Sequence, residues 1–269
     1  MKTTILIPAR HASSRYPGKP LVRLTLPDGQ KQSLIHLTWR AACDVQGPDN
    51  VFVVTDDDRI RDEAARIGAQ VIMTDPECEN GTARCAQALE RGNIDTDLVV
   101  NFQGDAPLTP PWFVRALIEA MAKDDRADMA TPVLQCDART YAMFLEDRRA
   151  GRVGGTTAVF DRDQRALYFS KEVIPRIDLA LGADGDIPVF HHVGVYAYRP
   201  AALRAYRGWP PGTLEQVEGL EQLRFLENGA HVRCVPVEAP GRLFWEVNHP
   251  EDVPRVEAAL REIARNRQG

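Results

Sequence analysis

The opening segment, residues 3–21, constrains the fold most, because a short apolar run passes directly into a loop with fixed positive charge. The run Ile5–Ile7 is typical of a buried parallel strand. Pro8 has no N–H to donate to a sheet, so we expect the strand to end there. Arg10, Arg15 and Lys19 lie in the loop, and cations at the carboxyl end of a parallel strand suit a polyphosphate. A solvated basic loop is the alternative interpretation.

An alternation of strands and helices continues from this loop to residue 123. Three further buried strands are expected at 51–55, 70–74 and 98–102. Helices are expected between them at about 34–45, with Ser33 as the cap, at 59–67 and at 81–91. This alternation predicts an α/β fold with a Rossmann-like, doubly wound and mostly parallel sheet. The acidic triplet 56–58 is explained either as metal ligands or, more simply, as a helix N-terminus.

Two polar turns follow buried strands of this sheet. Asp105 comes just after strand 98–102, in Gln103-Gly104-Asp105, where a carboxylate points out of the carboxyl edge of the sheet. There it is placed to hold Mg²⁺ against phosphate oxygens. The helix 81–91 begins with Asn80-Gly81-Thr82, and N–H groups at a helix start bind anionic ligands.

The rhythm changes after residue 128. We expect a hairpin from strands 156–160 and 166–169, a turn-rich segment at 176–188, and one strand over 191–199. Further on we expect one amphipathic helix over 214–228 capped by Thr213, a strand at 232–237 and a C-terminal helix to about 264. The chain is interpreted as one domain, 1–269, with a small antiparallel excursion at about 135–210.

Composition excludes several classes of protein. A net charge of −5, with Lys and Arg spread along the chain, argues against a nucleic-acid-binding protein. The N-terminus lacks the apolar core of a signal peptide, and we find no apolar stretch near the ~20 residues of a membrane span. Five irregularly spaced cysteines are interpreted as buried free thiols. We therefore expect a soluble cytoplasmic protein.

The order of residues in several motifs is more specific than their charges. Segment 8–21 has the order Pro-Ala-Arg-x-x-Ser-x-Arg-x-Pro-Gly-Lys-Pro-Leu, segment 103–107 is Gln-Gly-Asp-Ala-Pro, and segment 214–224 is Leu-Glu-x-x-Glu-x-Leu-Glu-Gln-Leu-Arg. These motifs closely resemble the sugar-acid cytidylyltransferases, above all those for 3-deoxy-manno-octulosonate (Kdo). The likeness extends from residue 3 to about residue 262.

The resemblance implies a Rossmann-like, Mg²⁺-dependent homodimer of the cytoplasm that transfers CMP from CTP to a 2-keto-3-deoxy sugar acid and releases pyrophosphate. Its product supplies lipopolysaccharide biosynthesis. The catalytic residues implied are Arg10, Arg15, Lys19 and Asp105. The nucleotide-binding residues implied are Pro8, Ala9, Arg10, Ser13, Ser14, Lys19, Asn80, Gly81, Thr82, Arg84 and Gln103. The metal ligands implied are Asp105 and Asn248, and the acceptor-binding residues Lys171, His192, Tyr196, Glu218 and Glu221.

The chain departs from the family pattern at several positions. Asn248 replaces a metal-binding aspartate, and Glu246 is the candidate to compensate. Ala83 and Ala106 replace acids. The segment 152–159 differs on the acceptor side, which leaves amino-sugar acids, nonulosonates and small phosphonates open as acceptors. A degenerate nucleotide-binding regulator is a second class of function. A dinucleotide-binding dehydrogenase is a third, which the absence of Gly-x-Gly-x-x-Gly after the first strand disfavours.

Overall fold

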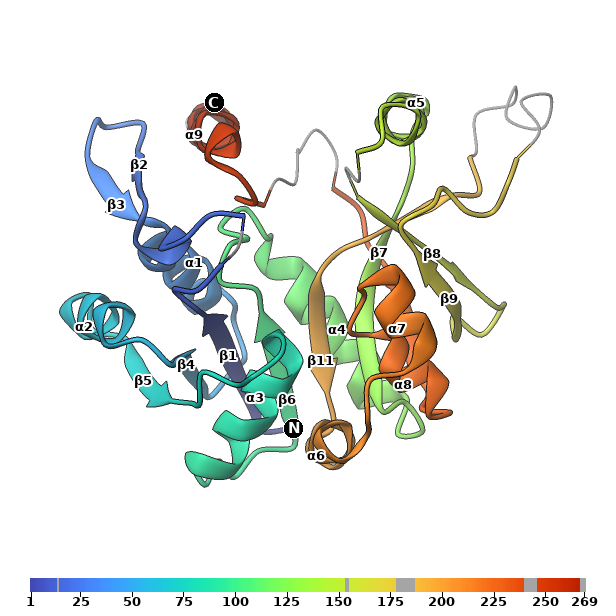
Figure 1. Cartoon of the computed structure of the whole chain (residues 1–269), viewed down its shortest axis with the longest axis horizontal. Coiled ribbons are helices and arrows are strands. Elements are labelled where there is room, and N and C mark those ends of the chain that lie inside the picture. The colour runs from blue at the N-terminus through green and yellow to red at the C-terminus, as the bar shows by residue number, and fades with distance from the viewer. Residues whose placement is uncertain (14, 153–154, 178–186, 240–245, 267–269) are drawn as a thin grey trace. The chain divides into compact units, whose positions relative to one another are not determined.

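The computed structural model describes residues 1–13, 15–152, 155–177, 187–239 and 246–266 (Figure 1). The chain divides into two compact units, the first formed by 1–115 with 240–269 and the second by 116–239. The predicted excursion falls within the second unit, and the single-domain interpretation stays a prediction.

The first unit is built on four parallel strands in the order β5-β4-β1-β6, as Figure 1 shows. Their bounds are Thr3–Ala9 for β1, Asn50–Thr55 for β4, Gln70–Met73 for β5 and Leu98–Phe102 for β6. In chain order this is the arrangement 3-2-1-4 of a doubly wound sheet, so the predicted α/β fold is confirmed. One boundary was wrong: β1 continues through Pro8 to Ala9, because a parallel partner, β4, still pairs with both residues.

Helices of the first unit begin where the sequence provides caps. They are α1 (Leu34–Cys43), α2 (Asp58–Arg66) and α3 (Gly81–Arg91). The side chains of Ser33, Asp57 and Asn80 accept hydrogen bonds from backbone N–H groups of the first turns. The capping interpretation of the acidic triplet is therefore confirmed for Asp57.

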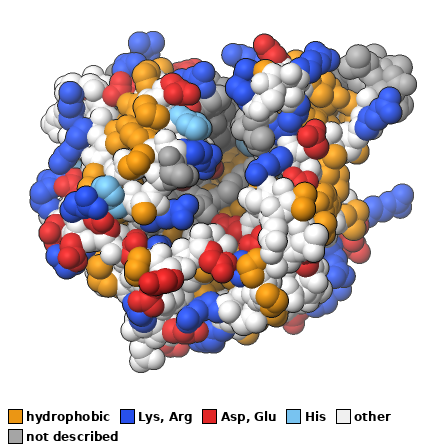
Figure 2. All heavy atoms as spheres, viewed as in Figure 1, with side chains coloured by type: hydrophobic (Ala, Val, Ile, Leu, Met, Phe, Trp, Pro, Cys, Tyr) orange, Lys and Arg blue, Asp and Glu red, His pale blue; other side chains and the backbone are white. Residues whose placement is uncertain are grey.

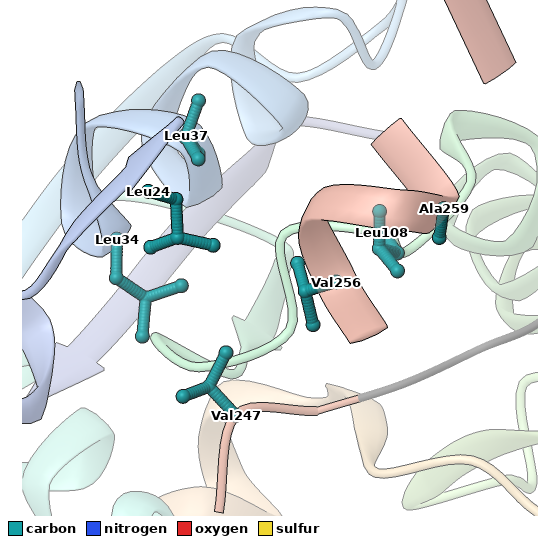
Figure 3. Packing of buried hydrophobic residues seen from close by; sticks show 7 residues of the cluster. All are labelled: Leu24, Leu34, Leu37, Leu108, Val247, Val256 and Ala259. Atoms are coloured by element: carbon teal, nitrogen blue, oxygen red, sulfur yellow. The ribbon is translucent and has the colours of Figure 1, made fainter. Parts of the chain in front are cut away.

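The C-terminal segment packs against the start of the chain within this unit. The short hairpin of β2 (Arg23–Thr25) and β3 (Lys31–Ser33) leads into α1, and the segment ends with the 3₁₀ turn η2 (Pro250–Asp252) and α9 (Val253–Asn266). Figure 3 shows the apolar cluster that joins them, with Leu34, Val247 and Val256 around a common space. Burial of Val247 fixes the backbone of its two polar neighbours, Glu246 and Asn248, which matters for the site.

The second unit is centred on β7 (Met129–Gln135). Strand β12 (Val232–Pro236) lies parallel along one edge of β7, while β10 (Phe190–His192) and β11 (Val195–Tyr198) pair with it antiparallel. Beyond β10 come β8 (Thr156–Phe160) and β9 (Ala166–Ser170), which form the predicted hairpin. The predicted antiparallel excursion is thus confirmed.

The expected strand over 191–199 is two strands, so that prediction was wrong. The pairing register along β7 shifts between His192, opposite Val133, and Ala197, opposite Ala130. Pro132 lies between these positions on β7 and has no N–H for the ladder, although its carbonyl accepts from Val193. The strand is therefore interrupted at 193–194.

The expected helix over 214–228 is also interrupted. It consists of α7 (Thr213–Glu218) and α8 (Leu223–Glu227), and Gly219 ends α7 at a φ of 62°. Thr213 is not the cap, because Gly212 occupies that position. Val217 is 81% exposed, although the apolar residues of an amphipathic helix are expected on its buried face.

The remaining comparisons with the sequence concern helices α4 to α6, the turn-rich segment and the cysteines. Helices α5 (Ala138–Arg149) and α6 (Pro200–Gly208) were not predicted from the sequence, whereas α4 (Pro111–Lys123) completes the alternation that was expected to reach residue 123. Most of the predicted turn-rich segment, 178–186, lies outside the described residues. The cysteines are free as predicted, but Cys43 is exposed and Cys78 only half-buried.

Surface charge and helix composition agree with the sequence. Figure 2 shows acidic and basic side chains interspersed over the face in view, unlike the continuous basic surface of a nucleic-acid-binding protein. Within the described residues, we find no helix with the length and apolar character needed to cross a bilayer.

Candidate active site

The carboxyl ends of β1 and β6 approach each other closely in the first unit. The two strands are paired in parallel as far as Leu6 and Asn101. Just beyond β6, a Cβ atom on Gly104 would lie 2.5 Å from the carbonyl oxygen of Pro8, so the turn needs glycine. This close approach brings Asp105 to the loop that follows β1.

Lys19 and Asp105 form an ion pair at this edge. Gly18 takes a φ of 69° and starts the 3₁₀ turn η1 (Lys19–Leu21), which turns the lysine back toward the sheet. Lys19 Nζ lies 2.5 Å from Asp105 Oδ2, and the two side chains are 12% and 23% exposed. Two residues that the sequence placed in one site, 86 positions apart, are thus in direct contact. Together they offer one cation and one carboxylate to a phosphorylated ligand.

The rest of the loop is folded on its own backbone. The carbonyl of His11 accepts hydrogen bonds from the N–H groups of Ser13 and Gly18, and the Ser13 hydroxyl accepts from the Tyr16 N–H. The side chains of Arg10 and Arg15 are exposed, as a phosphate-binding role requires. Pro8 is half-buried and Ala9 buried at the end of β1. Ser14 lies outside the described residues.

The start of α3 lies beside the ends of β1 and β6. Asn80 Oδ1 accepts from the Ala83 N–H at 2.8 Å, so this side chain is used as a cap. A Cβ atom on Gly81 would lie 3.4 Å from both Pro8 Cγ and Asn101 Nδ2 and 3.5 Å from Gln103 Nε2. Three predicted nucleotide-binding residues, Pro8, Gly81 and Gln103, therefore surround one point. Asn101 is a fourth member that the sequence interpretation missed.

Two other predicted nucleotide-binding side chains point into the protein. Thr82 is fully buried, so its side chain does not face a ligand. Arg84 is also buried: it donates to the Thr74 hydroxyl and forms an ion pair with Asp56 at 3.1 Å. The guanidinium thus joins α3 to the ends of β4 and β5, a contact that sequence spacing did not indicate.

Glu246 and Asn248 are held next to Asp105. The Val247 N–H donates to the Asp105 carbonyl at 3.0 Å, which ties this late segment to the end of β6. Asp252 Oδ2 accepts from the Asn248 N–H, and Asn248 Nδ2 lies 3.4 Å from Glu246 Oε2. Both candidates for the second metal-ligand position are therefore near Asp105.

The acidity of Glu246 reflects these surroundings. Burial raises the pKa of Glu246 from 4.5 to about 7, and the negative charge of Asp105 adds to the shift. The hydrogen bond from Asn248 and the charges of Lys19 and Arg15 act in the opposite direction. Among the described residues, no cluster of three or more His, Cys, Asp or Glu side chains surrounds a metal position. The oxygen donors at this edge are thus two carboxylates and one amide.

The predicted acceptor residues lie in the second unit, where Glu218 organises one group. Its carboxylate accepts hydrogen bonds from the Ser170 hydroxyl at 2.7 Å, the Lys171 N–H at 2.9 Å and the Tyr168 hydroxyl at 3.4 Å. Lys171 Nζ lies 2.9 Å from where a Cβ on Gly219 would be, so the glycine leaves room for the lysine. Lys171 and Glu218 are therefore brought together at the end of β9.

His192 and Tyr196 form a second group. Both ring nitrogens of His192 are within 3.0 Å of threonine hydroxyls, those of Thr131 and Thr156. Burial lowers the pKa of His192 to about 3, so the ring is neutral at pH 7. The Tyr196 hydroxyl donates to Gln222 Oε1 at 3.2 Å. His192 thus contributes packing and orientation rather than a free ring nitrogen.

The glutamates of the 214–224 segment have different surroundings. Glu221 lies in the turn between α7 and α8 and is half-buried. Glu215 is buried and forms an ion pair with Arg224 at 2.6 Å, so it lies in the interior and not on a solvent-exposed face. Gln222, next to Glu221, is a polar buried residue that the sequence interpretation did not single out.

A parallel sheet with a cation–carboxylate pair and a helix start at its carboxyl edge is typical of nucleotide-binding α/β proteins. Residues 4–233 match the model of a family described as cytidylyltransferase. The chain therefore belongs to the cytidylyltransferase family, and the predicted nucleotidyltransferase class is confirmed.

Individual relatives agree over nearly the full chain. It is 42% identical over 260 residues to a 3-deoxy-manno-octulosonate cytidylyltransferase from Maricaulis maris, covering 97% of each chain. It is 38% identical over 265 residues to an 8-amino-3,8-dideoxy-manno-octulosonate cytidylyltransferase from Shewanella frigidimarina, covering 97% and 99%. Among solved structures, CMP:2-keto-3-deoxy-manno-octonic acid synthetase complexed with CTP matches with a TM-score of 0.82 at 32% identity, covering 99% and 100%.

Proposed function

We propose that this chain transfers CMP from CTP to Kdo or a closely related 3-deoxy-octulosonate and releases pyrophosphate. The observation that carries the proposal is the Lys19–Asp105 pair at the carboxyl edge of the sheet, beside exposed arginines. Identity of 42% to a Kdo cytidylyltransferase over 97% of both chains supports the same reaction.

The reaction forms a bond between an acceptor hydroxyl oxygen and the α-phosphorus of CTP, and it breaks the bond between that phosphorus and the bridging oxygen to the β-phosphate. Charge neutralisation and in-line positioning matter more than a strong base. Arg10, Arg15 and Lys19 hold the triphosphate and stabilise the negative charge that develops on the leaving pyrophosphate. Exposure of both arginine side chains supports this assignment.

The nucleoside is assigned to the group around Gly81. The N–H groups at the start of α3 and the half-buried amide of Gln103 offer donors and an acceptor to a ligand. We expect CTP to be used in preference to ATP and GTP. Competition assays measure this preference, and equal use of a purine nucleotide would assign the chain to another branch of nucleotidyltransferases.

The donors near Asp105 fit Mg²⁺, which prefers carboxylate and amide oxygens. Asp105 and Asn248 would hold the ion, with Glu246 as the alternative to Asn248, because the charge of Asp105 acts on Glu246 and Asn248 contacts it. When bound, Mg²⁺ polarises phosphate oxygens and lowers the pKa of the attacking hydroxyl.

Three variants test the metal assignment. Asp105→Asn should abolish activity and reduce Mn²⁺ binding in the presence of CTP. Asn248→Asp should lower the Mg²⁺ concentration needed for half-maximal activity without changing the CTP requirement. An unchanged Mg²⁺ requirement in Asn248→Asp would transfer the assignment to Glu246, and Glu246→Gln should then weaken Mn²⁺ binding instead.

The acceptor is assigned to the second unit. Lys171, anchored beside Glu218, offers a cation to the acceptor carboxylate, and the half-buried Glu221 offers a carboxylate to sugar hydroxyls. Tyr196 is buried and donates to Gln222, so it supports this region from within. The relatives named for Kdo and for its 8-amino analogue are similar to this chain at 42% and 38% identity. Both acids are therefore candidates, and lipopolysaccharide biosynthesis is the proposed destination of the product.

We also propose a cytoplasmic homodimer. Leu167 on β9 and Val217 on α7 are 61% and 81% exposed, and a second copy of the chain would cover such side chains. Free cysteines suit a reducing compartment. Light scattering on a sizing column should give a dimer, and Val217→Asp should reduce it to a monomer. A wild-type monomer would contradict the assembly.

Pyrophosphate release from CTP tests the function, measured with Kdo, 8-amino-Kdo, a nonulosonate and a small phosphonate. We expect the first or second to support turnover at least ~100-fold faster than the others. Turnover only with a nonulosonate or phosphonate would contradict the proposed acceptor, and CTP binding without turnover would indicate a regulatory nucleotide-binding protein.

A further inference from the structure

Asn101 is a buried amide for which the fold provides no partner. It lies near the end of β6, is fully buried, and is preceded and followed by the apolar residues Val100 and Phe102. Neither Oδ1 nor Nδ2 has a hydrogen-bond partner among the described residues. An unpaired buried amide costs a sizeable part of the small net stability of a protein. An apolar residue of similar shape would avoid this cost, so the amide calls for an explanation.

The surroundings of Asn101 indicate why a buried amide occurs at this position. Its Nδ2 lies 3.4 Å from the Cβ position of Gly81, the first residue of α3, and Gln103 Nε2 lies 3.5 Å from the same position. The two amide nitrogens are therefore within about 7 Å of each other. Asn101 is fully buried and Gln103 only half-buried, so a ligand at the start of α3 meets Gln103 first.

The two amides are complementary once one of them turns. Both direct a nitrogen toward Gly81, and two donors do not bond to each other. A half-turn of the Gln103 amide would exchange its oxygen and nitrogen and present an acceptor, Oε1, to Asn101 Nδ2. The Gln103 N–H group then faces the ligand with a defined orientation.

We propose that Asn101 is a positioning residue of the nucleotide site, which fixes the amide of Gln103 when the nucleoside part of CTP binds. The Nδ2 group of Asn101, which has no partner among the described residues, becomes paired in the complex, so this part of the cost is removed on binding. The inference rests on the proposed function, because it assigns the nucleoside to the start of α3.

Four variants test the role of Asn101 in CTP binding. Asn101→Leu removes the amide and keeps its approximate shape, Gln103→Met removes the partner, and the double variant completes a cycle. Val99→Ala, which changes another fully buried residue of β6 without touching an amide, is the matched control. Asn101→Val replaces Asn101→Leu in these measurements if the leucine side chain does not fit at this position. Calorimetry measures the affinity for CTP and for inorganic tripolyphosphate, which engages only the basic loop, and thermal unfolding measures the ligand-free protein.

We expect Asn101→Leu to weaken CTP binding about tenfold, the effect of one buried hydrogen bond. Its tripolyphosphate affinity should equal that of the wild type, and its ligand-free melting temperature should be equal or higher. The double variant should bind CTP no more weakly than Gln103→Met. Val99→Ala should melt lower but bind CTP normally.

Three results would overturn the proposal. Normal CTP affinity in Asn101→Leu together with a lower melting temperature would mean that a buried water pairs the amide for stability alone. Additive losses in the double variant would mean that Asn101 does not act through Gln103. A wild-type protein that binds tripolyphosphate but not CTP would overturn the proposed function as well, so the two failures are distinguishable.

Discussion

The ion pair between Lys19 and Asp105 predicts that metal and nucleotide bind cooperatively. Each partner has a second assignment, Lys19 to the triphosphate and Asp105 to Mg²⁺, yet in this structure they bind each other at 2.5 Å. A charge-assisted hydrogen bond contributes about 1.5–3 kcal/mol net. A metal ion that binds Asp105 must break this ion pair, so its affinity is about 10- to 100-fold lower than it would be without Lys19. CTP removes this penalty by drawing Lys19 to its phosphates.

The variant Lys19→Met isolates this effect, since it keeps the length of the side chain and removes the charge. Without CTP, its Mn²⁺ affinity, measured by electron paramagnetic resonance of the free ion, should rise about 10- to 100-fold. Its turnover should fall by ~100-fold or more. Arg15→Met is the control, because it removes an exposed cation that makes no ion pair with Asp105 among the described contacts. Its Mn²⁺ affinity should change by less than about threefold. If Lys19→Met binds Mn²⁺ no more tightly than the wild type, the predicted cooperativity between metal and nucleotide binding is wrong.

Three further perturbations have defined outcomes. Arg15→Ala should lower turnover by ~100-fold or more and leave the melting temperature unchanged, because the side chain is exposed. Gly104→Ala should destabilise the fold by about 1–3 kcal/mol in urea unfolding, since its Cβ would lie 2.5 Å from the Pro8 carbonyl oxygen. Gly208→Ala, whose Cβ would meet no atom within 4 Å at the end of α6, should not destabilise it. Burial lowers the pKa of His192 from 6.5 to about 3 in the folded protein. As the pH falls below 6.5, the unfolded chain therefore takes up a proton on His192 that the folded protein does not. The free energy of unfolding consequently decreases as the pH falls from 6.5 toward 3. By pH 5 the loss should be about 2 kcal/mol, and His192→Gln should remove that part of the pH dependence.

Local patterns predicted the parts of the fold that depend on near neighbours. The capping side chains of Ser33 and Asn80 begin helices where the sequence indicated. Strand β6 and the turn to Asp105 also follow from an apolar run ended by glycine. These features could be predicted because each is determined within a few residues.

The errors arose where distant segments decide the structure. Apolar spacing alone favoured one helix over 214–228, but Gly219 adopts a positive φ and ends it. Pro132 interrupts a neighbouring strand through the sheet, which no pattern within that strand indicates. Glu246 lies beside Asp105 because of a backbone hydrogen bond across more than 140 positions, and Asn101 lies under Gly81 because of packing between β6 and α3.

CMP transfer by this protein is tested by detecting the product itself. Wild-type protein, CTP, Mg²⁺ and Kdo should give, in ³¹P NMR, a phosphodiester signal of CMP joined to the sugar acid and pyrophosphate in equal amounts. Asp105→Asn should give neither. Pyrophosphate without the ester, or an undiminished ester signal from Asp105→Asn, would contradict the assignment of CMP transfer to the site at the carboxyl edge of this sheet.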